Sequence, residues 1–60
     1  MTKLKRVIES KGIKQRHIAK RSGIHETLIS MISTGRVVPT VKEKRKIATA
    51  LKMPIRKVFT

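Results

Sequence analysis

Residues 15–34 of the chain read QRHIAKRSGIHETLISMIST, and two helical patterns meet within this stretch. A helix-turn-helix needs two helices that cross steeply and are joined by a tight turn. Ala19 is small enough to let the second helix approach, and Gly23 tolerates the positive φ that such a turn requires. Ile24 follows the turn and can fill the gap between the helices. The stretch therefore predicts a helix-turn-helix whose core consists of Ile18, Ala19, Gly23, Ile24, Ile29 and Ile32.

Upstream of this stretch, apolar residues at helical spacing predict a first helix over about residues 2–10. Thr2 is a suitable N-cap for it. Gly12 stands where a glycine commonly ends a helix. The stripe expected to face the core consists of Leu4, Val7 and Ile8.

Downstream, residues 35–39 are expected to form a loop, since Pro39 disfavours helix at the residue before it. Thr40 and Glu43 match the capping box that begins a helix. The inner face of this fourth helix is expected to consist of Val41, Ile47, Ala48 and Leu51. Pro54 opens a last short turn whose apolar residues fold back onto the core, namely Ile55, Val58 and Phe59. The patterns together predict a compact all-α fold of five short helices without a strand.

The chain has 60 residues, which predicts one domain over residues 1–60 with a small core. The chain contains sixteen Lys and Arg residues but three acidic residues, and its formal net charge is +13. Such a chain is drawn to polyanions, so nucleic acid, an anionic membrane surface and an acidic protein are the candidate partners. Phe59 is the sole aromatic residue. RNA and single-strand binders usually stack bases on several aromatic side chains, so the lack of further aromatic residues favours duplex DNA as the partner.

Other classes of protein fit the composition poorly. The chain has no Cys and no Asp, and its three Glu residues are scattered, so no nucleophile, paired acid and base, or thiolate metal site is predicted. His17 and His25 lack the spacing of a zinc motif and are expected to be surface or capping residues. No apolar run is long enough to cross a bilayer, and no signal peptide is visible. We therefore expect a cytoplasmic, nucleoid-associated protein that is not an enzyme, with no cofactor, metal or small-molecule ligand.

Residues that match the sequence pattern of a known protein family recur along nearly the whole chain, both within residues 15–34 and beyond them. They are Gly12-Ile13-Lys14-Gln15, Ile18-Ala19, Ser22-Gly23-Ile24, Ile29-Ser30, Gly35, Pro39, Ile47-Ala48, Ala50-Leu51 and Phe59. In these residues the chain resembles the phage repressor and Cro family, often called the Xre family. The resemblance implies a lambda-repressor-like domain that binds double-stranded DNA sequence-specifically as a transcriptional regulator. It also implies a prokaryotic, phage or mobile-element origin.

The resemblance further implies a role for the third helix, about residues 25–34, which would lie in the major groove. The residues expected to contact bases are Glu26, Thr27, Ser30, Met31 and Thr34. Those expected to contact phosphates are Lys14, Gln15, Arg16, Lys20, Arg21, His25, Arg36, Lys42, Lys44 and Arg45. Gln15 would also brace the third helix. Family members commonly bind as dimers, and residues 36–39 and 55–59 are the expected contact surfaces of a weak or DNA-assisted homodimer.

The chain departs from the family pattern at three positions. Lys14 and His25 stand where the family usually has a Ser, Thr or Asn cap, and Ser33 replaces a common acidic residue. These changes remove negative charge or weaken helix caps. They affect the expected geometry of the DNA contacts more than the expected fold.

Plainer readings of several residues remain open. Gln15 can simply cap its own helix, and Glu26 is favourable in the first turn of any helix. Met31 can be partly buried, and Leu28 can be an exposed apolar residue. The charge run at the start of the fourth helix can be solvated.

Two other functions compete with the regulator. The fold alone does not exclude an antitoxin-like module of a toxin–antitoxin pair, which would bind an acidic protein as well as DNA. A cationic membrane-active peptide is disfavoured, because the Gly, Pro and capping signals predict a compact fold rather than one long amphipathic helix.

Overall fold

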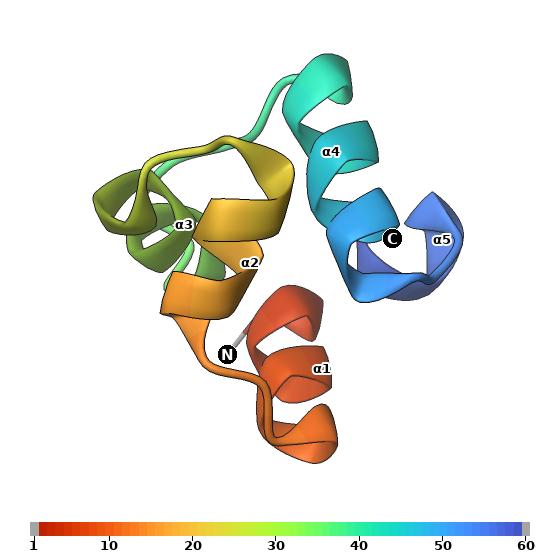
Figure 1. The fold of residues 1–60 in the computed structure, drawn as a ribbon. Helices are drawn as coiled ribbons and strands as arrows, with labels where there is room; N and C mark the ends of the chain where they lie inside the picture. Colours follow the sequence, from red (N-terminus) through yellow and green to blue (C-terminus); the bar gives the residue numbers. More distant parts are fainter. Residues whose placement is uncertain (1, 60) are drawn as a thin grey trace.

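The computed structural model describes residues 2–59, and these form five helices with no strand among them (Figure 1). The helices are α1 (Lys3–Lys11), α2 (Gln15–Ser22), α3 (Glu26–Ser33), α4 (Val41–Leu51) and α5 (Ile55–Val58). The predicted all-α architecture and the order of its helices are confirmed. The expected third helix over residues 25–34 is α3 together with its two capping residues, His25 and Thr34.

Side-chain caps fix where α1 and α4 begin. The backbone N–H of Lys5 donates to Thr2 Oγ1 at 3.1 Å, which satisfies one of the unpaired donors of the first turn. At α4 the N–H of Glu43 donates to Thr40 Oγ1 at 3.2 Å, and the N–H of Thr40 donates to Glu43 Oε1 at 2.8 Å. Both predicted caps are therefore present, the second as a complete capping box.

Left-handed residues end the first, second and fourth helices. Gly12 and Gly23 follow α1 and α2 with φ of 66° and 75°. Lys52 follows α4 with φ of 57° and is the one residue other than glycine with positive φ within residues 2–59. Such a residue lets the chain turn away from the helix while its N–H pairs with the last free carbonyls.

The helices pack around one core. α2 packs against α3 and α4, whereas α1 packs against α3 and α5, and α4 also contacts α5. Figure 1 shows α2 in the middle, with α3 on one side and α5 on the other. The buried apolar side chains are Leu4, Ile8, Ile18, Ile24, Ile29, Ile32, Ile47, Ala48, Ala50, Leu51 and Val58. Of the residues predicted for the core of the helix-turn-helix, the four isoleucines are buried, Ala19 is half-buried against them and Gly23 is exposed at the turn.

One predicted position differs in the structure. Val41 was expected on the inner face of α4 but is 64% exposed. It lies six residues before Ile47, the first buried residue of α4, and a rise of about 1.5 Å per residue carries it roughly 9 Å beyond the core. Leu28, for which exposure was left open, is half-buried and packs against the core.

Candidate nucleic-acid interface

The turn between α2 and α3 is held by backbone conformation and by one side chain. A Cβ added to Gly23 would meet nothing within 4 Å, so glycine is needed there for its φ of 75° and not for space. Ser22 Oγ accepts a hydrogen bond of 3.2 Å from the N–H of Ile24. Ile24 is buried in the core, as predicted. The turn therefore fixes the angle at which α3 leaves α2.

His25 caps α3 with its ring. The N–H of Thr27 donates to His25 Nδ1 at 3.2 Å. Because Nδ1 accepts this bond, the proton of the neutral ring lies on Nε2, which can donate outward. His25 is thus an exposed capping residue, as expected. The expected weakening of the cap is seen at Lys14, whose side chain makes no capping hydrogen bond at the start of α2.

The exposed side of α3 forms the wall of an open surface hollow of about 460 Å³. Its lining residues are Gln15, His25, Glu26, Thr27, Ser30, Met31 and Arg36. All residues expected to contact bases except Thr34 thus lie around one hollow, together with three of those expected to contact phosphates. Met31 is half-buried and lines the hollow at the same time, so the two readings of this residue are compatible.

Thr34 lies outside this hollow. It is the C-cap residue of α3, and its Oγ1 donates to the carbonyls of Ser30 at 3.0 Å and Met31 at 3.2 Å. Its hydroxyl is thus already paired with α3. A base contact by Thr34 would need this side chain to turn.

Gln15 joins the start of α2 to the end of α3. Its Nε2 donates to Ser33 Oγ at 3.2 Å, and Ser33 Oγ donates to the carbonyl of Ser30 at 2.9 Å. Ser33 is fully buried. The amide of Gln15 therefore braces α3 rather than capping its own helix, while the same side chain lines the hollow.

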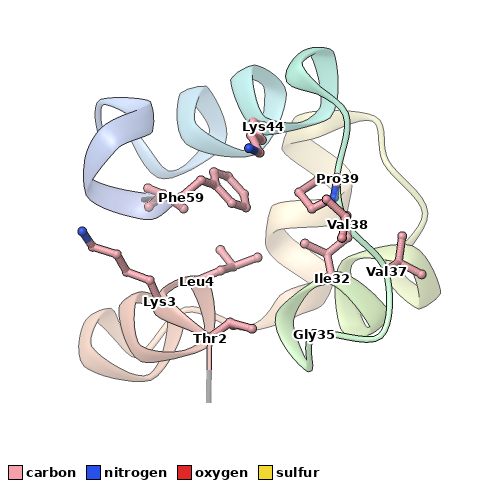
Figure 2. A pocket seen from close by; sticks show the side chains of 11 residues that line it. Thr2, Lys3, Leu4, Ile32, Gly35, Val37, Val38, Pro39, Lys44 and Phe59 are labelled. Atoms are coloured by element: carbon pink, nitrogen blue, oxygen red, sulfur yellow. The ribbon is translucent and has the colours of Figure 1, made fainter.

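The basic residues expected to contact phosphates fall into separate groups. Arg21 and Arg45 line a small hollow between α2 and α4, and Lys46 lies beside them. Lys44, in contrast, is half-buried and lines an apolar groove, where it lies above Leu4 and Phe59 (Figure 2). The remaining cations of the predicted set are exposed, namely Lys14, Arg16, Lys20, Arg36 and Lys42.

With this geometry in view, the comparison with known families is decisive. The helix-turn-helix family model matches residues 4–58 of the chain. The chain belongs to the lambda repressor/Xre-like helix-turn-helix family. It is therefore a DNA-binding helix-turn-helix regulator. No curated protein and no solved structure shows a significant match to the chain.

For a helix-turn-helix protein of this family, two features escaped the sequence analysis. Ser33 was seen only as a departure from the family, although it follows Ile32 and lies four residues after Ile29, which places it on the inner face of α3. Lys46 was not among the predicted phosphate contacts, although it lies beside Arg45. The hollow that Lys46 shares with Arg21 forms between two helices, and a linear charge pattern does not reveal such a contact.

Neither a metal-binding cluster nor a membrane-spanning helix is found in the described part of the chain. Within residues 2–59, no group of three or more His, Cys, Asp or Glu side chains lies close enough to hold a metal ion. None of the five helices combines the length and apolarity needed to cross a membrane.

Proposed function

We propose that the protein is a sequence-specific transcriptional regulator whose helix α3 lies in the major groove of duplex DNA. The observation that carries this proposal is the hollow along α3, where Glu26, Thr27, Ser30 and Met31 face outward together. Glu26 can accept from cytosine N4, and the Thr27 methyl can contact the thymine methyl. Ser30 can donate or accept, so it discriminates less between bases.

Phosphate contacts at both ends of the hollow would set the position of α3. Gln15 and His25 lie near the start of α2 and α3, and Arg36 lies beyond the end of α3. The Gln15 amide and the outward Nε2 of His25 are donors suited to phosphate oxygens. Arg21, Arg45 and the exposed lysines would then supply affinity that does not depend on sequence.

Selection from a randomised duplex pool tests this function. Bound duplexes would be selected and the winner titrated against scrambled DNA at ~150 mM salt. A specific regulator prefers its site by about 10³-fold or more. Equal binding to all duplexes that vanishes with salt would contradict the proposal and leave only electrostatic attraction.

A pair of matched variants locates the recognition surface. Glu26→Gln and Glu9→Gln each remove one exposed carboxylate, from α3 and from α1 respectively. Glu26→Gln should change the preferred base at one position of the site, with a discrimination of about 1–3 kcal/mol, whereas Glu9→Gln should leave the selected sequence unchanged. An identical selected sequence for both variants would remove Glu26 from the set of base contacts.

We also propose that the regulator forms a weak, DNA-assisted homodimer. Residues 36–39 and 55–59, which the sequence analysis names as contact surfaces, both contribute to an apolar groove of about 370 Å³. Phe59 and Pro39 lie on facing sides of this groove in Figure 2, with Val38 next to Pro39. Val38, which lines the groove, is 84% exposed, so its side chain is open to contact by a partner.

Two exposed valines provide the test of dimerisation. Val38→Ser should reduce two-to-one binding to a palindromic duplex, whereas Val41→Ser, at a valine that does not line the groove, should not. Sedimentation of the protein–DNA complex gives the stoichiometry. A wild-type protein that stays monomeric on the palindromic site at saturation would contradict the dimer.

A further inference from the structure

A second cationic surface lies on α1, away from the hollow along α3. It surrounds a hollow of about 680 Å³ lined by Lys3, Arg6, Val7, Ser10, Lys11 and Met53. None of these residues lines the α3 hollow. Arg6 and Lys11 are exposed at its rim, and Val7 and Met53 are half-buried. We call this area the α1 surface.

The start of α5 adds charge next to the α1 surface. Lys3 Nζ donates to the carbonyl of Arg56 at 3.3 Å, which holds the two helices side by side. Lys52, which precedes Met53, and Lys57 of α5 are also exposed. The sequence places one carboxylate, Glu9, on these elements. The α1 surface is therefore strongly cationic.

These cations oppose the stability of the fold. The first turn of α1 has no acidic residue and carries Lys3 and Lys5, so positive charge meets the positive end of the helix dipole. Mutual repulsion between cations adds to this cost in a small domain of marginal stability. A bound polyanion would relieve both effects.

A duplex bound at α3 does not account for the charge on the α5 side of this surface, and no residue that lines the α1 hollow lines the α3 hollow. Helices α3 and α5 lie on opposite sides of the molecule in Figure 1, and the smallest of the Cα extents is 19 Å. The Debye length at physiological salt is about 8 Å. Charges on the α5 side are therefore screened from the phosphates of DNA on the α3 side.

We propose that the α1 surface binds the phosphate backbone of a second DNA duplex, so that the protein bridges two DNA segments. The proposal rests on the proposed function, which supplies the first duplex. Membranes and protein partners fit the surface less well, since interfacial membrane helices and protein hot spots commonly add apolar or aromatic anchors to the charge. The exposed large apolar residues of the described chain are Val38 and Val41, and neither lines the α1 hollow. The phosphate backbone of DNA, in contrast, can be bound by the cations of the α1 surface alone.

A bead assay tests the bridging. A duplex of unrelated sequence is attached to beads, and capture of a second, labelled duplex is measured with and without protein. Wild-type protein should capture the second duplex. The double variant Arg6→Gln/Lys11→Gln should capture it roughly tenfold less, because two phosphate contacts are lost. Its binding to a single duplex in a gel shift should stay near the wild-type value, and circular dichroism confirms that it folds.

Two further variants separate the possible origins of bridging. Arg16→Gln/Lys20→Gln, with the same loss of charge on α2, should weaken binding to the first duplex in the gel shift. Val38→Ser should leave capture of the second duplex intact. If dimers formed through the apolar groove bridged the duplexes instead, this variant would lose the capture. Wild-type capture that is absent, or that survives Arg6→Gln/Lys11→Gln, overturns the proposal. Loss of sequence preference in the pool selection would instead overturn the proposed function. The bead assay would still measure bridging, because it uses a duplex of unrelated sequence.

Discussion

Ser33 is a single residue at which three segments of the chain meet. Its carbonyl accepts a hydrogen bond from Thr2 Oγ1, and its hydroxyl accepts one from Gln15 Nε2. The family commonly has an acidic residue near this position, where a buried carboxylate would need a charged or multiply hydrogen-bonded partner. A neutral hydroxyl satisfies the amide of Gln15 without burying a charge.

Replacing Ser33 with alanine should therefore weaken both the fold and DNA binding. The loss of the hydroxyl should lower the free energy of unfolding by about 1 kcal/mol, which lowers Tm by roughly 4–8 °C in a domain of this size. The Gln15 amide then loses its anchor, so DNA affinity should also fall. Thermal melts and gel shifts measure the two effects. The exposed Ser10→Ala is the control, with a change within about 0.5 kcal/mol. Equal melts for the two variants would refute this role of Ser33.

Lys52 adopts a left-handed conformation that glycine adopts more easily. With φ of 57°, its Cβ crowds the following carbonyl, at a cost of about 1 kcal/mol or more. Lys52→Gly should raise the free energy of unfolding by about 0.5–1 kcal/mol after the extra entropy of the unfolded chain is subtracted. Chemical denaturation measures the change. The converse substitution, Gly12→Ala at φ of 66°, should destabilise by a similar amount. Destabilisation by Lys52→Gly would show that the lysine side chain makes a compensating contact.

At the scale of helices, α2 begins without a side-chain cap, as the short α5 also does. α1, α3 and α4 each have a side chain that accepts from a first-turn N–H, whereas Lys14 supplies none. Its positive charge also opposes the helix dipole. The start of α2 is thus the local weak point of the helix-turn-helix.

Lys14→Ser should consequently stabilise the free protein by about 0.5–1 kcal/mol, since serine can accept from the unpaired N–H groups of α2. The same substitution at Lys20, within α2, removes equal charge and should cost a few tenths of a kcal/mol through lower helix propensity. Thermal melts without DNA compare the two variants. A Lys14→Ser protein no more stable than Lys20→Ser would mean that the cap does not form.

Helix boundaries could be predicted because their signals are local. Thr2, Thr40 and Glu43 predict caps, and Gly12 and Gly23 predict ends, within a few residues of sequence. Val41 was misplaced because periodicity gives the direction of a side chain around the helix axis and not whether another element lies opposite it. The bond between Gln15 and Ser33, and the half-burial of Lys44, depend on packing between distant segments and could not be predicted.

At the scale of the whole molecule, the net charge of +13 acts on folding and on DNA binding in opposite directions. Repulsion between the cations destabilises the free protein and attraction to phosphates stabilises the complex, and salt screens both. Raising NaCl from about 50 to 200 mM should therefore raise the Tm of the free protein. Over the same range DNA affinity should fall about 10³-fold if six phosphates are contacted.

Thermal melts and DNA titrations along one salt series check this prediction. Sucrose at matched osmolality is the control, because it leaves charge screening unchanged. A free protein whose Tm falls as NaCl rises would show that attractive ion pairs, and not repulsion, dominate its electrostatics.

The hydrogen bond from Thr2 to the carbonyl of Ser33 joins residues 31 apart in sequence and bears on the order of folding events. The helix pair α2–α3 closes over a short stretch of chain and needs little loop entropy, so its contacts can form early. The acceptor at Ser33 faces Thr2 only after the last turn of α3 exists. We therefore expect docking of α1 to complete the native state rather than to nucleate it, so that helix α3 gains its final constraint from the N-terminal helix.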